Sequence, residues 1–290
     1  MRHFAFDSWE ERSAAHNMAL DAHRLHQGSS SPSLRIYGWR PASLSLGRFQ
    51  KIDADWIAKL QAAGLGVTRR GSGGGAILHA GELTYSLIAR YADFGLERRA
   101  EPVYRLLHRA WMDALAQVAG VDRSIMFMRE EREPDAASEG EVRTLCFTRR
   151  TAFDVLVEID RVDARDDASS CGAAMGVSEQ AVELLRDAMP DAKPLRYSKL
   201  IGSAQRRRGE VFLQHGSIKL ARSPVAPWVA SLADLAAGEW SGARHGEALA
   251  SAFASSLGWK LGAANADREE LAAQIAHFES ANWILHGKRG

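Results

Sequence analysis

The strongest periodic pattern of hydrophobic positions lies between Pro102 and Gly120. There, apolar residues recur at the three- and four-residue spacing that places them on one face of a helix. A first helical turn tolerates Pro102, and glycine commonly ends a helix. We therefore predict an amphipathic helix that packs against a sheet through Val103, Leu106, Leu107, Ala110, Trp111, Ala114, Leu115 and Val118.

Other stretches of the chain have helix signals of the same kind. Ser13 can cap a helix that runs to about residue 27, where Gly28 ends it. Asp53 can cap a second helix over residues 54–63, ended by Gly64. Two further predicted helices cover residues 178–189 and 267–286.

Shorter runs alternate between apolar and polar residues or are rich in β-branched residues, which is typical of strands. The predicted strands cover residues 34–37, 43–46, 76–78, 83–89, 153–159, 201–205 and 211–220. Arg40 and Pro41 stand in the turn between the first two, and residues 206–209 in the turn between the last two. Because strands and helices mix without a regular alternation, we predict an α+β fold with a mixed, mostly antiparallel sheet flanked by helices.

The chain of 290 residues is long enough for one large domain or two modest ones. We predict a single domain over residues 1–290, with a surface excursion at about residues 160–196. From about residue 224 onward the pattern predicts a helical C-terminal part.

Composition and charge narrow the function classes. The hydrophobic share of 46% and the charged share of 25% are typical of a globular protein, and the net charge of +1 argues against a general nucleic-acid binder. Cys146 and Cys171 cannot form a disulfide framework, and they suit a reducing compartment. No apolar stretch reaches the ~18 residues of a membrane span, and the first residues lack a signal-peptide core. We expect a cytoplasmic protein with no nucleic-acid or membrane partner, no metal and no cofactor.

One loop has a composition that suggests binding. Two arginines precede a glycine-rich run and a short apolar strand: Arg69, Arg70, Gly71, Ser72, Gly73, Gly74, Gly75, Ala76, Ile77, Leu78 and His79. Glycine lets backbone N–H groups approach a ligand closely, and the arginines can neutralise an anion. By composition alone, a binding loop and a plain tight turn both stay open.

Several separated stretches share motifs with one enzyme family. They are Asn17-Met18-Ala19-Leu20-Asp21, residues 34–50 with Ser45-Leu46-Gly47-Arg48-Phe49-Gln50, the glycine-rich loop with Glu82-Leu83-Thr84-Tyr85-Ser86, the lysine motif Lys199-Leu200-Ile201-Gly202-Ser203-Ala204-Gln205, Gln214-His215-Gly216-Ser217-Ile218, and Phe278-Glu279-Ser280-Ala281-Asn282-Trp283. In this order they resemble the family of lipoate–protein ligases, octanoyltransferases and biotin–protein ligases. The resemblance is closest to the cysteine-dependent octanoyltransferases, and it places residues 34–50 in a first hairpin.

Two features depart from that family pattern. His79 is followed by Ala80, where the family usually has an aspartate. About 37 residues, 160–196, separate the strand at 153–159 from the lysine motif, which usually follows closely.

The resemblance implies transfer of an octanoyl group from a thioester to a lysine. A nucleophile can split such a transfer into two steps, and Cys146 stands where cysteine-dependent members carry theirs. A free cysteine has a pKa of ~8.5, so its thiolate needs a nearby cation. We expect Lys199 to be that cation, and also to take a proton from the incoming lysine if burial lowers its pKa.

The resemblance also implies a substrate pocket around the loop and the lysine motif. The candidate binding residues are Arg69, Arg70, Gly73, Gly74, Gly75, Ala76, His79, Gly202, Ser203 and Ala204. His79 is equally compatible with a buried core histidine. An apolar tunnel for the acyl chain would come from Leu46, Ile77, Leu78 and Leu83, each of which can also be ordinary core.

The implied partners are octanoyl-acyl-carrier protein as donor and, as acceptor, the lipoyl domain of the glycine cleavage H protein or of a 2-oxoacid dehydrogenase. Such carriers tend to be acidic, so the arginines at 149–150 and 206–208 either steer them or are solvated turn charges. One alternative is an ATP-dependent lipoate–protein ligase that forms a lipoyl-adenylate. Others are a non-catalytic lipoyl- or cofactor-binding protein, and an amidotransferase between two carrier domains.

Overall fold

A computed structural model describes residues 2–28, 31–131, 152–158, 175–188, 196–263 and 271–287. Its strands are β1 (Arg2–Arg12), β2 (Ser33–Trp39), β3 (Ser43–Leu46), β4 (Gly66–Arg69), β5 (Ile77–His79), β6 (Glu82–Arg90), β7 (Met126–Met128), β8 (Val155–Glu158), β9 (Tyr197–Arg208), β10 (Val211–Lys219) and β11 (Trp259–Ala263). Its α-helices are α1 (Ala14–Gln27), α2 (Ala54–Ala62), α3 (Ala100–Ala119), α5 (Glu179–Asp187), α6 (Leu232–Leu235), α7 (Gly242–Ser256), α8 (Ala272–Glu279) and α9 (Ala281–His286).

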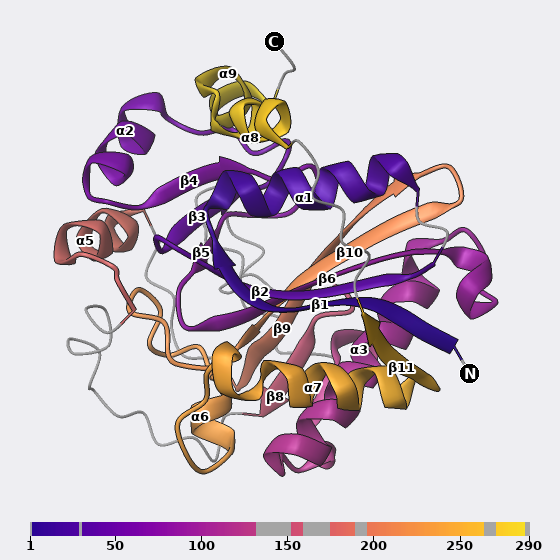
Figure 1. The fold of residues 1–290 in the computed structure, drawn as a ribbon. Coiled ribbons are helices and arrows are strands. Elements are labelled where there is room, and N and C mark those ends of the chain that lie inside the picture. The colour runs from indigo at the N-terminus through magenta and orange to yellow at the C-terminus, as the bar shows by residue number, and fades with distance from the viewer. Residues whose placement is uncertain are drawn as a thin grey trace.

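A large sheet and a small sheet form the centre of the described part of the chain (Figure 1). The large sheet has the strand order β11-β1-β2-β6-β10-β9-β8-β7, and the small sheet has the order β4-β3-β5. β1 pairs in parallel with β2 and β11, whereas the other neighbours in the large sheet are antiparallel. The prediction of an α+β fold with a mixed, mostly antiparallel sheet is confirmed.

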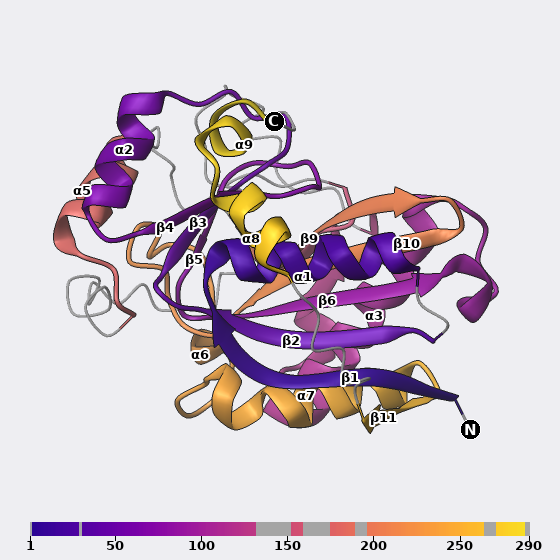
Figure 2. The same ribbon diagram turned by 45° about the horizontal axis from the view of Figure 1, so that its top comes forward.

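Helices cover both faces of the large sheet. α3 and α7 pack against each other on one face, and α1 lies across the other (Figure 2). α2, α8 and α9 pack against β4 of the small sheet. α1 therefore lies between the two sheets and can present side chains to the space that they enclose.

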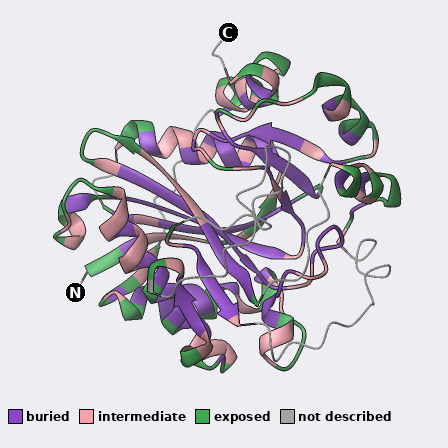
Figure 3. Ribbon diagram, turned by 180° about the vertical axis from the view of Figure 1, so that it is seen from behind, coloured by how far each residue is buried: buried purple, intermediate pink, exposed green. Residues whose placement is uncertain are grey.

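The main core lies between the large sheet and the pair α3 and α7. The predicted apolar face of α3 is the buried one, since Val103, Leu107 and Trp111 are 0% exposed. The ring of Trp111 stacks on Phe253 of α7 with 4.3 Å between the ring centroids. Full burial of one such side chain stabilises the fold by about 1.5–3 kcal/mol. The burial pattern in Figure 3 follows this core, with buried residues along the central strands and exposed ones on the outer faces of the helices.

Local signals located several helix ends correctly. Ser13 caps α1 by accepting a hydrogen bond from the N–H of His16, and Gly28 follows its last residue with φ 67°. Asp53 caps α2 in the same way through Trp56 N–H, and Gly120 ends α3 in the left-handed region. Glycine is favoured there because it has no Cβ to clash with the backbone.

Long-range pairing corrects several expectations. β2 and β3 do not form a hairpin: β2 pairs with β1 and β6, and β3 pairs with β4 and β5. The C-terminal part is not only helical, because β11 pairs with β1. The predicted helix at 267–286 is divided at Ser280, which caps α9. β9 extends to Arg208, so the arginines at 206–208 belong to a strand and not to the turn.

The described part of the predicted excursion is not all surface. Ala181 and Leu185 of α5 are 0% and 1% exposed, and they belong to a second core with Ile57, Leu60 and Val67. This core supports the small sheet from the side of α2. Residues 160–174 and 189–195 of the predicted excursion lie outside the described residues.

Candidate active site

A cavity of about 660 Å³ opens between the two sheets. Its wall is built from the loop between β4 and β5, the loop after β3, α1 and the strands β2, β6, β9 and β10. The lining residues are Met18, Tyr37, Trp39, Phe49, Gln50, Lys51, Arg70, Gly73, Gly74, Gly75, Ile77, His79, Thr84, Gly202, Ser203, Ala204, His215, Gly216 and Ser217. The fold thus brings the glycine-rich loop and the lysine motif, far apart in sequence, to one cavity.

Most of the predicted binding residues line this cavity, but not all. Arg69 and Ala76 are buried and do not belong to its lining, and the same holds for Lys199, which was predicted as a catalytic residue. Of the predicted tunnel residues, Ile77 lines the cavity, whereas Leu46, Leu78 and Leu83 are core side chains. The candidate nucleophile Cys146, like Cys171 and the arginines at 149–150, lies outside the described residues.

Arg70 holds the glycine-rich loop from inside the protein. Its guanidinium donates to the carbonyl oxygens of Gly73 at 3.1 Å and Gly75 at 2.9 Å, and to both oxygens of Ser45 at 2.7 Å. Gly74 has φ 97°, a conformation that other residues rarely adopt. Gly47 lies so close that an added Cβ would come within 1.8 Å of the Gly74 carbonyl oxygen. The loop is therefore held in one shape by its own arginine and by the loop after β3.

Arg69 is buried outside the cavity lining and ties the C-terminal helix α9 to the site. It donates to the carbonyl oxygens of Gly47, Gln50 and Ile284 at 2.6–2.8 Å. In return, the indole N–H of Trp283 donates to the carbonyl of Arg69 at 2.7 Å. The Arg69 guanidinium thus donates its hydrogen bonds to carbonyl oxygens of the protein itself. This geometry does not favour the expected contact of Arg69 with a bound anion.

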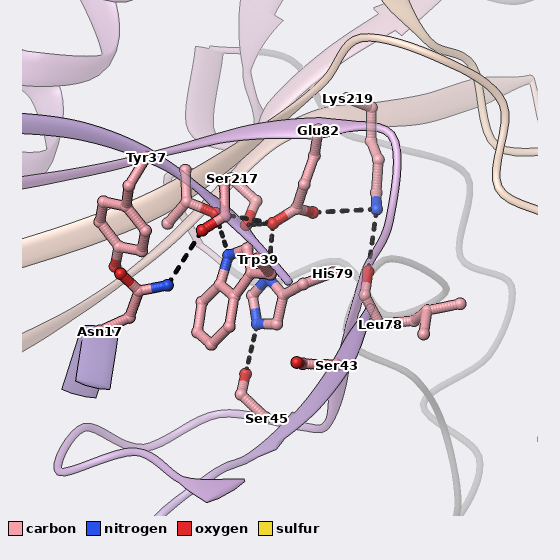
Figure 4. Close-up of polar contacts among 12 residues, drawn as sticks. Asn17, Tyr37, Trp39, Ser43, Ser45, Leu78, His79, Glu82, Ser217 and Lys219 are labelled. Carbon is pink, nitrogen blue, oxygen red and sulfur yellow. Dashed lines mark hydrogen bonds and ion pairs between the residues drawn. The ribbon is translucent and has the colours of Figure 1, made fainter. Parts of the chain in front are cut away.

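A cluster of charged and hydroxyl side chains, here called the Glu82 cluster, stands behind His79 (Figure 4). Glu82 accepts hydrogen bonds from His79 Nδ1, from Thr84 and Ser217 at 2.8 Å, and from Lys219 at 3.1 Å. Burial alone would raise the pKa of Glu82, but the ion pair with Lys219 and these hydrogen bonds outweigh it and lower that pKa. Glu82 is therefore a buried carboxylate with its own buried counter-ion.

His79 links the Glu82 cluster to the glycine-rich loop. Burial lowers the pKa of His79, so it is neutral at physiological pH. Its Nδ1–H donates to Glu82, which leaves Nε2 to accept from the Ser45 hydroxyl at 2.6 Å. The Ser45 oxygen in turn accepts from Arg70, and the indole of Trp39 stacks on the imidazole at 3.7 Å. His79 is thus both a buried histidine and a wall of the cavity.

A second set of polar side chains, Asp21, His215 and Ser72, joins α1 to the glycine-rich loop. Asp21 accepts a hydrogen bond from His215 Nδ1 at 3.1 Å and forms an ion pair with Arg35 at 3.5 Å. The other ring nitrogen of His215 lies 2.6 Å from the hydroxyl of Ser72. Burial opposes the ionised form of Asp21, but Arg35 and His215 lower its pKa. The sequence motif contains Asp21, but it did not indicate that His215 would contact Asp21 and link it to Ser72.

Lys199 lies behind the wall formed by Gly202. Its Nζ forms an ion pair with Asp154 at 2.9 Å, and its side chain is 1% exposed. A Cβ added to Gly202 would lie 2.3 Å from Lys199 Cε and 2.8 Å from Nζ, so only glycine leaves room for the amine there. The paired carboxylate favours the charged form of Lys199. This geometry supports the expected role as a cation and weakens the expected role as a proton acceptor.

Sequence reasoning missed Glu82, Lys219, Asp154 and His108 as contributors to the site. A signal for the first two was present, because Glu82 begins β6 and Lys219 ends β10, each beside a run of apolar or neutral residues. Their register pairs Lys219 directly with Glu82. That register is a tertiary fact that the local pattern does not contain.

The described residues contain no group of three or more His, Cys, Asp or Glu side chains that could hold a metal ion. Within the same ranges, no helix combines the length and apolar character needed to cross a membrane.

Arg206 of β9 donates to the carbonyl of Gly71 at 3.3 Å, so one of the three arginines at 206–208 supports the glycine-rich loop.

Comparisons with known proteins agree with this arrangement. The family model described as the lipoyl protein ligase A/B catalytic domain matches residues 13–224. The chain is 31% identical to a protein named octanoyltransferase LipM from Kyrpidia tusciae, over 93% of this chain and 94% of that one. It is 35% identical to another protein of that name from Exiguobacterium, over 73% of this chain and 63% of the relative.

Solved structures with the same fold include a putative lipoate protein ligase from Thermoplasma acidophilum with bound lipoic acid. It has a TM-score of 0.64 and 16% identity, and the match covers 98% of this chain and 99% of that one. A lipoate-protein ligase A bound with ATP has a TM-score of 0.63 and 16% identity, with 99% of each chain covered. At this identity the likeness shows the fold alone. From the family model and the relatives, this chain belongs to the family of lipoyl protein ligase A/B catalytic domains.

Proposed function

We propose that this chain transfers an octanoyl group from octanoyl-acyl-carrier protein to a lysine of a lipoyl domain, through an acyl-cysteine on Cys146. The chain is an acyltransferase that acts in lipoate biosynthesis, as the names of its relatives indicate. The structural observation that supports the proposal most is the shared cavity. The glycine-rich loop and residues Gly202–Ala204 form parts of one wall, with the charged Lys199 directly behind.

The transfer proceeds in two balanced steps. The Cys146 thiolate forms a bond to the thioester carbonyl carbon, and the thiolate of the carrier leaves with the electrons of the broken C–S bond. The amine of the acceptor lysine then forms a C–N bond to the same carbon and loses a proton, and the Cys146 thiolate leaves. The ammonium of Lys199 stabilises negative charge near the site in both steps.

The cavity provides surfaces for the acyl group and its carbonyl. Met18, Tyr37, Trp39 and Ile77 offer apolar contacts to an octanoyl chain. Since Arg70 engages the carbonyls of Gly73 and Gly75, the loop can direct peptide N–H groups to the thioester carbonyl and its oxyanion. The Glu82 cluster holds this loop in place.

The acceptor in this proposal is the lipoyl domain of the glycine cleavage H protein or of a 2-oxoacid dehydrogenase, and the enzyme is cytoplasmic. The arginines at 207–208 stand exposed at one end of β9, where they can attract an acidic carrier. Such steering would weaken as salt is added.

One experiment tests the proposal directly. Incubation with octanoyl-carrier protein in the absence of ATP should add one octanoyl mass to the intact protein. The adduct should be lost in Cys146→Ser and kept in the matched control Cys171→Ser. A protein that forms no adduct without ATP, but forms a lipoyl-adenylate with ATP, would instead be a ligase. A protein that binds lipoyl compounds and does neither would be non-catalytic.

A further inference from the structure

The cavity opens to solvent where two loops meet. Among the described residues that line it, three are exposed: Phe49 and Lys51 after β3, and Gly74 in the glycine-rich loop. A residue that lines a cavity and is also exposed lies where the cavity meets solvent. The two loops touch, since a Cβ added to Gly47 would come within 1.8 Å of the Gly74 carbonyl oxygen. Residues 47–51 and Gly74 are here called the rim of the cavity.

Phe49 is the apolar side chain of this rim. It is 82% exposed, and within the described ranges it is the one large hydrophobic residue that stands exposed. Single exposed hydrophobic residues are common on proteins, so its place at the mouth of a cavity is the feature that needs a reason. An exposed phenyl ring contributes little to the core, whereas covering it with another molecule releases free energy in proportion to the apolar area buried.

The backbone on both sides of Phe49 is held firmly. Arg69, which is 1% exposed, donates to three carbonyl oxygens of the rim, those of Gly47, Arg48 and Gln50, at 2.6–3.2 Å. The N–H of Gln50 donates to the carbonyl of Gly47 at 3.1 Å and closes a turn that contains Phe49. A fixed backbone, and not a loose loop, therefore presents the ring to solvent.

The same guanidinium anchors the rim to the C-terminal helix. Arg69 donates to the carbonyl oxygens of Trp283, Ile284 and Leu285 at 2.8–3.1 Å, at the end of α9. The last carbonyls of a helix have no partner within it, so Arg69 satisfies them and the rim at once. The protein thus uses one buried side chain and its C-terminal helix to hold Phe49 in a fixed place.

We propose that Phe49 is a specificity-determining contact, and that its ring packs against the acceptor domain beside the target lysine. This inference rests on the proposed octanoyl transfer for the identity of that acceptor, a lipoyl domain. Arg69 is the residue that positions the ring, through the backbone of the rim.

The reach of the two substrates favours the acceptor over the donor at this place. A lysine carries its amine on four methylene groups, so the polypeptide around it has to come to the mouth of the cavity before the amine can enter. An acyl-carrier protein holds its acyl group on a much longer prosthetic arm, so its surface can stay further away. Charge agrees with this choice, because half-buried Arg48 and exposed Lys51 flank Phe49 and attract the acidic surface expected of the acceptor.

The test compares the acceptor domain with a small acceptor. The enzyme is loaded with octanoyl-carrier protein, and the loss of the adduct is followed by intact mass at several concentrations of lipoyl domain. In Phe49→Ala the concentration that gives half the maximal rate should rise by about 10- to 100-fold, the effect of losing the burial of one large apolar side chain. Phe49→Tyr keeps the ring and should keep most of the affinity. With Nα-acetyl-lysine amide, which offers the amine without a protein surface, Phe49→Ala should slow transfer far less.

Two further measurements separate docking from support of the fold. Phe49→Ala should unfold at the temperature of the wild type, because the exposed ring buries little area in the free protein. Arg69→Lys keeps the charge but loses the planar fork that binds several carbonyls, so the half-saturating concentration of lipoyl domain should rise in this variant too. Adding Phe49→Ala to Arg69→Lys should then have a smaller effect than Phe49→Ala has alone, because the ring is no longer held in place.

An unchanged half-saturating concentration of lipoyl domain in Phe49→Ala, or an equal loss with the small amine, would overturn the inference while the proposed function stands. A loss confined to the loading step would assign the rim to the carrier and would overturn it as well. A protein that never forms the octanoyl adduct would overturn the proposed function. The inference is then still tested by calorimetric binding of the lipoyl domain to the unloaded enzyme, where Phe49→Ala should raise the dissociation constant by the same factor and equal constants would overturn it.

Discussion

Two buried polar networks lie around the cavity, and they provide partners for their buried polar groups in different ways. The Glu82 cluster places a carboxylate, an ammonium and a neutral histidine in the interior, and the carboxylate and the ammonium balance each other's charge by direct contact. A second network, here called the Ser203 chain, links Gln205, Gln214, Tyr85, Ser203 and His108. It has no net charge and ends on the backbone carbonyls of Ala100 and Phe153. Each contains a neutral histidine bonded to a hydroxyl that is linked to the cavity wall. The charged network holds the shape of the loop, whereas the neutral network joins β6, β9 and β10 to α3 on the other face of the large sheet.

The physical reason for this difference is the free energy that each network loses when one of its groups loses its partner. A buried charge that loses its partner leaves a large desolvation penalty, so charged groups suit a framework that never changes. A neutral hydrogen bond contributes less, but its direction can be set by its neighbours.

The largest expected effect concerns Lys199, the cation beside the Ser203 chain. Lys199→Ala should reduce octanoyl transfer by at least about 1000-fold, because the positive charge near the reacting thiolate and oxyanion is lost. The measurement is the rate of lipoyl-domain octanoylation under saturating donor. A variant with near-wild-type turnover would remove Lys199 from the mechanism.

The next effect tests the Glu82 cluster. Lys219→Met should lower the free energy of unfolding by about 3–5 kcal/mol, because Glu82 would remain as a buried carboxylate without its counter-ion. Urea denaturation measures the change. The double variant Lys219→Met/Glu82→Gln should recover part of the loss, and a single variant as stable as the wild type would show that the pair is not balanced as described.

The third prediction uses pH to separate the contributions of His108 and His79 to the stability of the fold. In the folded protein the pKa of His108 is lowered to about 4, mainly by burial, while in the unfolded chain it is ordinary. Above about pH 6.5 His108 is neutral in both the folded and the unfolded state, so its contribution to stability is complete there. Below that pH only the unfolded state gains a proton, and the contribution is lost as the pH falls toward 4.

Between pH 7.5 and 4.5 this loss amounts to about 2–3 kcal/mol from His108. Denaturant unfolding at the two pH values measures it. His108→Gln should lose that much less stability than the wild type, and the contribution of His79, whose pKa is also lowered, should remain in both proteins. Parallel pH profiles for the two proteins would contradict the neutral His108.

The smallest expected effect is that of Tyr85→Phe. Loss of the hydroxyl removes the donor to Ser203 and leaves the amide of Gln214 without its acceptor, at a cost of about 1–2 kcal/mol in unfolding free energy. Differential scanning calorimetry measures it. The matched control is Tyr91→Phe, which removes a hydroxyl from a tyrosine that packs on Phe212 in the same core. A loss in Tyr85→Phe no larger than that of the control would argue against the directed chain.

Features of the fold that depend on neighbouring residues were predictable from the sequence. The caps Ser13 and Asp53 and the apolar face of α3 are local, because they depend on residues within a few positions of each other. The hairpin of β9 and β10 was predicted for the same reason. The misplaced hairpin of β2 and β3 shows the limit, since adjacent strands were assigned to one sheet although each pairs with a strand further along the chain.

For the site, the sequence alone determined the glycine-rich loop, the lysine motif and the family that they resemble. These are short stretches whose chemistry can be recognised without knowing where they lie. Only the tertiary structure showed that Arg69 donates to the Ile284 carbonyl, that Lys199 is paired with Asp154, and that His108 contacts Ser203 across 95 positions of sequence. A hydrogen bond depends on distance and direction in space, and local patterns of residues do not contain either quantity for groups so far apart.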